Sequence, residues 1–312
     1  MTAFFQKTRK KSYDLFSGYS HYVPGIKGTV GLILLLLAGN LMGSAVVFLF
    51  GIFFSADDAL TYGPLLAYPV MFIPPMAYAS FMSRRNELFD TGYALDSNNF
   101  GKAGGWLMAI MVSVATLAVG FLMDPVNAAL PKMPESLEKI LENMVSDGPL
   151  WVSLLSVSVM APFFEEWLCR GMILRGLLRK MHPVWAMVIS SFCFALIHLN
   201  SWQGIPAFIL GMLFAYVYYK TGSLKLTMLM HCVNNTFAVI VGQIDSLKDV
   251  DFMFQIMDRW QYISLLAASL VIIVLFVDIV WKNIPMKSPE GNMDIITTED
   301  MDTPDSRQSG TL

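Results

Sequence analysis

The sequence predicts an all-α protein, a polytopic membrane helical bundle with about eight transmembrane helices. Of its 312 residues, 55% are hydrophobic and only 14% are charged, whereas a soluble domain carries charge at about a quarter of its positions. Apolar stretches of the ~20 residues that a membrane-spanning helix needs recur along the chain. The length suits one helical bundle, and the composition argues against a water-soluble protein.

Eight segments are apolar and long enough to be considered as spans. They are residues 29–54, 62–83, 104–125, 150–180, 184–200, 205–220, 224–243 and 262–282. The first is long enough to tilt or bend, and the second contains Pro69, Pro74 and Pro75, so we expect it to be kinked or broken. Residues 134–146 are apolar on one face only, which predicts a helix lying at the membrane interface.

The distribution of lysine and arginine predicts the orientation of this integral, multi-pass membrane protein. One side receives the basic amino end, Arg84, Arg85, Arg175, Arg179, Lys180, Lys220, Lys225, Lys282 and Lys287. The other side receives Asp57, Asp58 and the loops 126–149 and 245–258, where positive charges lie mostly among acids. Eight spans with both termini cytoplasmic satisfy this pattern. The segment 286–312 is acidic, lacks an apolar period and is predicted to be disordered.

Three short patterns place polar groups inside apolar segments. They are Glu165-Glu166-x-x-x-Arg170, Phe194-x-x-x-His198 and His231-x-x-x-Asn235. A charge near the bilayer centre costs at least ~2.5–3.5 kcal/mol, so an ionisable residue inside a spanning helix is a functional-site hypothesis by default. We therefore expect these side chains to form one buried polar site.

The depth of two of these residues can be compared across a predicted helical hairpin. Glu165 lies 16 residues before Met181, and His198 lies 16 residues after His182, on either side of the turn. At 1.5 Å per residue both are ~24 Å from that turn, so their side chains can meet in a cavity, which we expect to open to the cytoplasm. His231 is only nine residues from Gly222, which puts it nearer the cytoplasm than His198. Either the fourth helix protrudes from the bilayer or the seventh helix is tilted.

These residue types suit hydrolysis of an amide bond by water. Such a reaction needs a base to deprotonate water and donors to stabilise the developing oxyanion. Glu165 is the candidate base, and His198 is a candidate for sharing the water and protonating the leaving amine. His231 and Asn235 are candidate oxyanion donors. In support, Glu166 with Arg170 is predicted to form an internal ion pair, and Phe194 to pack beneath His198.

The three motifs, in this order, resemble the CPBP family of membrane proteins, also called Abi or CAAX protease and bacteriocin-processing proteins. The resemblance covers residues 149–242 and implies an intramembrane endopeptidase, similar to the enzyme that trims prenylated CAAX proteins. It implies that Glu165 and His198 activate water, that His231 and Asn235 bind the oxyanion, and that no cofactor is needed. The expected partners are membrane lipid and a peptide or lipidated protein substrate, and not nucleic acid.

The predicted organisation has four parts. Residues 1–148 hold a basic amino-terminal segment, three transmembrane helices and the interfacial helix, and residues 149–243 form the CPBP-like catalytic core. Residues 244–285 contain the last transmembrane helix, and residues 286–312 form the acidic tail. The role of residues 1–148 stays open, since the motifs do not cover them.

Two other functions are compatible with the sequence. Glu165, His198 and His231 supply three ligands for a zinc-dependent intramembrane peptidase, with water as the fourth ligand. The spacing differs from H-E-x-x-H, however, and no further acid is evident as the base. The second alternative is a non-catalytic membrane immunity or scaffold protein, because fold does not fix function. A transporter is less favoured, since the two halves of the chain show no repeat.

Overall fold

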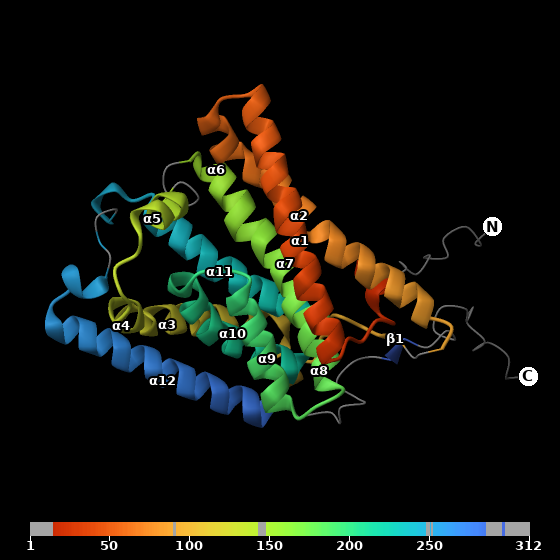
Figure 1. The fold of residues 1–312 in the computed structure, drawn as a ribbon. Coiled ribbons are helices and arrows are strands. Elements are labelled where there is room, and N and C mark those ends of the chain that lie inside the picture. The colour runs from red at the N-terminus through yellow and green to blue at the C-terminus, as the bar shows by residue number, and fades with distance from the viewer. Residues whose placement is uncertain are drawn as a thin grey trace, which may run out of the picture.

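The computed structural model describes residues 15–89, 92–142, 148–247, 250, 252–284 and 295–296. Most of these residues are helical, which confirms the predicted all-α membrane bundle (Figure 1). Within the described part, seven helical units are long and apolar enough to cross a membrane. They are α1 (Ile26–Phe53), α2 (Ala56–Asn86), the unit from η2 to α4 (Gly101–Ala128), the unit from α6 to α8 (Leu150–Leu178), α10 (Ser201–Thr221), α11 (Leu224–Gly242) and α12 (Arg259–Asn283).

The predicted span 184–200 is shorter than expected. It corresponds to α9 (Pro183–Leu196), whose 14 residues extend ~21 Å, less than the ~30 Å hydrocarbon core of a bilayer. The helix ends because the backbone reverses: Leu199 adopts a left-handed φ of 56°, and the Asn200 side chain caps α10 by accepting a hydrogen bond from the backbone N–H of Gln203. His198 therefore lies in the turn between α9 and α10 and not on a spanning helix.

The unit from η2 to α4 consists of η2 (Gly101–Ala103), α3 (Gly104–Leu122) and α4 (Asp124–Ala128). The other described elements are short: η1 (Ser17–Tyr19), α5 (Glu135–Glu142), η6 (Asp245–Leu247) and η7 (Met253–Gln255). Helix α5 forms where an interfacial helix is predicted. In the acidic tail, β2 (Ile295–Ile296) pairs antiparallel with β1 (Gly92–Tyr93). The prediction of disorder for the rest of that tail, and the basic residues 1–14, lie outside the described residues.

Helices α1 and α2 form a closely packed antiparallel pair. Helix α2 continues without a break through Pro64, Pro69, Pro74 and Pro75. Of the two predicted outcomes, a kink or a break, the break does not occur, and the kink stays a prediction. A Cβ atom added to Gly39 of α1 would lie 1.9 Å from the Met71 carbonyl oxygen of α2. The absence of a side chain at this glycine therefore allows the two backbones to touch, and it fixes the position of α2 beside the rest of the bundle.

The unit from α6 to α8 is the most buried of the seven candidate spans, with 61% of its apolar window inside the protein. It is assembled from α6 (Leu150–Ser153), a π-helical segment η4 (Leu154–Met160), α7 (Ala161–Glu166), a second π-helical segment η5 (Trp167–Leu174) and α8 (Arg175–Leu178). Figure 1 shows α7 between α1 and α11. Helical segments with π geometry are frequent at functional sites, and two of them here flank the residues Glu165 and Glu166.

One buried arginine, Arg175, connects α8 to the segments that pack around it. The Arg175 guanidinium donates hydrogen bonds to the backbone carbonyls of Tyr19, Ser20 and Tyr22, and to that of Tyr93 in β1. These bonds attach the segment that precedes α1 to α8. They also satisfy the donors of a side chain that is fully buried.

Candidate active site

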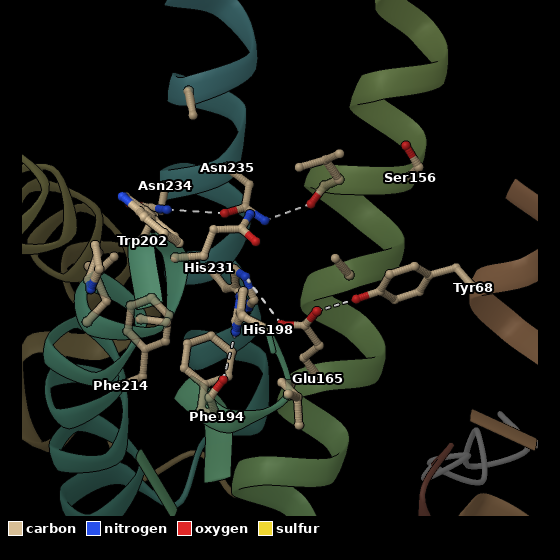
Figure 2. A pocket seen from close by; sticks show the side chains of 18 of the residues that line it. Tyr68, Ser156, Glu165, Phe194, His198, Trp202, Phe214, His231, Asn234 and Asn235 are labelled. Carbon is tan, nitrogen blue, oxygen red and sulfur yellow. Dashed lines mark hydrogen bonds and ion pairs between the residues drawn. The ribbon is translucent and has the colours of Figure 1, made fainter. Parts of the chain in front are cut away.

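A cavity of about 460 Å³ lies among α2, α7, α10 and α11. Its lining includes all four predicted catalytic residues, which are Glu165, His198, His231 and Asn235, together with the predicted supporting residue Phe194. Figure 2 shows these side chains directed toward one another from different parts of the chain. The structure therefore brings the three sequence motifs together, while their chemical roles stay predictions.

Glu165 presents one carboxylate oxygen to a partner and the other to the cavity. The Tyr68 hydroxyl of α2 donates a hydrogen bond to Glu165 Oε1 (Figure 2). Glu165 Oε2 is buried and makes no hydrogen bond within the described part of the chain. A buried carboxylate oxygen without a donor is costly, so this atom is available to bind a proton or a water molecule.

The His231 ring lies between the two adjacent glutamates. Its Nδ1 is 3.2 Å from Glu166 Oε1, and its Nε2 is 3.9 Å from Glu165 Oε2. Glu166 thus contacts both Arg170 and His231. The contact with Arg170 was predicted from the sequence, and the contact with His231 was not. Because a carboxylate only accepts hydrogen bonds, the contact with Glu166 fixes a proton on Nδ1. The residue spacing predicted that His231 is nearer the cytoplasm than His198, and its ring nevertheless reaches Glu165.

Arg170 and Glu166 form the predicted ion pair, at 2.7 Å, and both side chains are fully buried. The guanidinium also donates a hydrogen bond to the Gly211 carbonyl at 3.0 Å. Its central carbon lies 4.4 Å from the centre of the Phe194 ring and 5.3 Å from that of Phe214. The arginine therefore offsets the charge of Glu166 and ties η5 to α9 and α10 around the site.

Phe194 contacts both imidazoles of the site. The centre of its ring is 5.3 Å from the His198 ring and 5.3 Å from the His231 ring, and both contacts are edge-to-face. Its backbone carbonyl accepts a hydrogen bond from His198 Nδ1 at 2.8 Å. That bond leaves the His198 Nε2 lone pair as the acceptor of the neutral ring. Phe194 therefore holds the two histidine rings in position through its own ring and its carbonyl group.

Asn235 is oriented by a carbonyl that the helix itself leaves unpaired. In the π-helical register of η4, the Ala161 N–H bonds to the Ser156 carbonyl five residues earlier. The next bond in that register would join residue 162 to the Val157 carbonyl, but Pro162 has no N–H. The Asn235 amide nitrogen donates to this carbonyl instead, at 2.8 Å. One N–H of the amide remains for another acceptor.

Sequence reasoning missed Tyr68. This residue is separated from Glu165 by 97 positions, and it lies in the amino-terminal region that the motifs do not cover. The available signal is a tyrosine within a proline-rich apolar helix, and many such tyrosines only anchor helices at the membrane surface. The structure shows that the amino-terminal helices contribute directly to the site.

The alternative zinc site is not assembled in the described part of the structure. Among the residues that the structure describes, no three His, Cys, Asp or Glu side chains are grouped so that they could hold a metal ion. The Tyr68 hydroxyl, the Phe194 carbonyl and Glu166 contact Glu165 Oε1, His198 Nδ1 and His231 Nδ1, and these contacts leave Glu165 Oε2, His198 Nε2 and His231 Nε2 as the remaining donor atoms. The metal-free and the zinc-dependent mechanisms both stay predictions.

These features define the class of protein. A multi-pass membrane bundle that encloses a carboxylate, two imidazoles and an amide in one cavity has the composition of an intramembrane hydrolase. Residues 147–237 match the family model described as type II CAAX prenyl endopeptidase Rce1-like. This match spans all three motifs, confirms the resemblance to the CPBP family and indicates a CAAX protease-like endopeptidase of the membrane. No curated protein and no solved structure gave a match to the chain.

Proposed function

We propose that this protein hydrolyses a peptide bond of a membrane-associated or lipidated peptide or protein, and that Glu165 activates the attacking water. The single observation that carries the proposal is Glu165 Oε2, a buried oxygen of a cavity-lining carboxylate that lies 3.9 Å from His231 Nε2 and makes no hydrogen bond within the described residues. Tyr68 occupies the other oxygen of the same carboxylate. A general base must lie within hydrogen-bond reach of the proton it removes, and Glu165 Oε2 is placed for a water molecule in the cavity.

In the proposed reaction, water transfers a proton to Glu165 Oε2 while its oxygen bonds to the carbonyl carbon of the substrate. The carbonyl π electrons move to oxygen and produce an oxyanion. When this intermediate collapses, the C–N bond breaks and the leaving nitrogen takes up a proton from Glu165 or from His198. The His198 ring suits this relay because its Nδ1 proton is held by the Phe194 carbonyl, which leaves Nε2 to accept a proton and release it.

The oxyanion is assigned to His231 and Asn235. When His231 is protonated on both nitrogens, Nδ1–H is held by Glu166 and Nε2–H is directed toward the cavity beside Glu165. Asn235 is held through one N–H by the Val157 carbonyl and offers its second N–H. Donors fixed in advance by other contacts stabilise a developing charge without the cost of reorganisation, which supports this assignment.

We also propose the orientation in which both termini are cytoplasmic. The described helices place basic residues at one end of the bundle, namely Lys27, Arg84, Arg85, Lys102, Arg175, Arg179, Lys180, Lys220, Lys225 and Lys282. The opposite end carries Asp57, Asp58, Asp124, Glu135, Glu138, Glu142 and Asp258, with Lys132, Lys139 and Arg259. An excess of lysine and arginine in short loops marks the cytoplasmic side.

The decisive experiment compares Glu165→Gln with the purified wild-type protein. Cleavage is measured in detergent or liposomes with fluorogenic apolar peptides, with and without a lipidated cysteine. We expect Glu165→Gln to abolish cleavage and Glu138→Gln, a matched change on α5, to preserve it. Unchanged cleavage by Glu165→Gln would exclude the proposed base. Rescue of a deletion phenotype by this inactive variant would favour the non-catalytic scaffold or immunity function.

The metal requirement is tested on the same preparation. The proposal needs no cofactor, so cleavage should survive a chelator and should not depend on added zinc. Stoichiometric zinc in the purified protein, together with loss of cleavage on chelation, would favour the zinc peptidase that uses Glu165, His198 and His231 as ligands.

A further inference from the structure

The cavity occupies only one half of the bundle. Along the unit from α6 to α8 it extends from Glu165 toward the amino end, as far as Ser156. Along α11 it extends from His231 toward the carboxyl end, as far as Ala238, which is exposed. Its lining on α2 belongs to the first half of that helix, and on α10 it begins at Trp202 in the first turn and ends at Phe214. Figure 2 shows the same direction, with Ser156, Asn234 and Asn235 on one side of the Glu165 level.

These parts of the four helices end at the same face of the molecule. Tyr62 near the start of α2 contacts Trp151 of α6. Trp202 near the start of α10 donates a hydrogen bond to the Pro131 carbonyl, in the segment between α4 and α5. We name this face the α6 face, and it carries the acidic residues given above.

The other half of the bundle is closed below the site. On the unit from α6 to α8, the residues that follow Glu165 and Glu166 are fully buried, including Trp167, Leu168, Cys169, Arg170 and Met172. Further along, Arg175 binds four backbone carbonyls of the segments that cover α8. A substrate therefore has no evident path to Glu165 from the basic face through the described core, whereas Ser156, Asn234 and Ala238 line a path from the α6 face.

From these two observations we infer that the site receives its substrate from the side of the membrane opposite the cytoplasm. This inference rests on the proposed function, and it names the substrate class: an apolar, membrane-anchored peptide segment presented on the non-cytoplasmic side. It reverses the expectation of a cavity open to the cytoplasm. The basic face is the cytoplasmic one by the distribution of lysine and arginine, and the cavity extends toward the opposite face.

The chemistry of the lining agrees with an apolar peptide. The walls are formed mainly by side chains such as Met71, Ala161 and Leu210, and the ionisable groups in the lining are those of Tyr68, Glu165 and the two histidines. Between the site and the α6 face, Asn234 and Gln203 supply amides that can pair with a peptide backbone. An extended peptide with apolar side chains can pack against the apolar walls while its backbone forms hydrogen bonds with these amides.

Cysteine labelling tests the inference without using catalysis. Asp57→Cys and Glu87→Cys place a thiol at either end of α2, and both positions are exposed. Ala238→Cys places one on the cavity wall. The native cysteines are buried or half-buried, and the unmodified protein gives their background. A membrane-impermeant maleimide is added to intact cells and, separately, to inside-out vesicles.

In intact cells we expect labelling of Asp57→Cys and Ala238→Cys and only background labelling of Glu87→Cys, with the reverse result in inside-out vesicles. Labelling of Glu87→Cys in intact cells would overturn the orientation. If Ala238→Cys is labelled only from the cytoplasmic side, or from neither side, the inferred entry is wrong. Labelling does not require activity, so the two proposals can fail separately. If the labelling is as expected but the protein cleaves no peptide, the proposed function is refuted and the inferred direction of the cavity is not.

Discussion

The buried ion pair between Arg170 and Glu166 provides the sharpest test of how the site is held together. Replacing Arg170 by methionine keeps an apolar side chain of similar length but removes the guanidinium. Glu166 then loses its 2.7 Å partner while both positions stay fully buried. The change also removes the hydrogen bond to the Gly211 carbonyl and the contact with the Phe194 ring.

Removing one partner of a buried ion pair costs about 3–5 kcal/mol, because the remaining charge has no compensation. For a protein of this size or somewhat smaller, each kcal/mol lowers the melting temperature by about 2 °C or more. We therefore expect Arg170→Met to melt roughly 6–10 °C below the wild-type protein. Replacing both partners, as in Glu166→Gln with Arg170→Met, should recover much of this loss, since no buried charge is left unpaired.

The assay is thermal unfolding in detergent, followed by the fraction of protein that remains monodisperse on size exclusion. A matched control comes from α12, where Lys282 and Asp278 have the same i, i+4 spacing at 2.8 Å but side chains that are 68% and 49% exposed. Lys282→Met should cost only ~0–1 kcal/mol. If Arg170→Met melts no lower than Lys282→Met, burial of charge is not what makes the pair at the site important.

Three further outcomes follow from other contacts. Tyr68→Phe should lower kcat/KM by roughly tenfold to hundredfold, the equivalent of losing a ~1.5–3 kcal/mol hydrogen bond to a charged group. Asn235→Leu should reduce the free energy of unfolding by about 1 kcal/mol in SDS titrations, because the half-buried Val157 carbonyl of η4 loses its donor, and it should also abolish cleavage. Gly39→Ala should destabilise the protein in the same titration by forcing α1 from α2, whereas Gly31→Ala, where a Cβ meets nothing within 4 Å, should be neutral. Equal stability of the two glycine variants, or an unchanged kcat/KM for Tyr68→Phe, would contradict the contacts described.

Much of the site was predictable because its signals are local. An acid or imidazole in an apolar segment is visible without a structure, and the i, i+4 spacing put Glu166 with Arg170 on one helix face. The hairpin turn between α8 and α9 was also predictable from Pro183, and it brought Glu165 and His198 to the same cavity. These inferences need only helix geometry and the cost of burying polar groups.

The missed features depend on contacts between distant segments or on backbone geometry that composition does not encode. The Tyr68 hydroxyl meets Glu165 only because Gly39 lets α2 pack closely on α1. The π-helical segments change the register of the central helix, which is how one ring comes within reach of both adjacent glutamates. The early end of α9 is followed by the left-handed φ at Leu199, and the apolar composition of this segment does not predict that backbone conformation.

The charges around His231 explain why these groups are found together. Glu165 and Glu166 each carry a negative charge when ionised, and Arg170 supplies one positive charge, so the buried group is neutral only when His231 is protonated or when one carboxylate is. Arg170 and the Nδ1–H of His231 both contact Glu166, so the further proton of a neutral group has its place between His231 Nε2 and Glu165 Oε2. A proton on His231 leaves Glu165 ready to act as a base and gives the oxyanion its donor, so one protonation state prepares both halves of the proposed reaction.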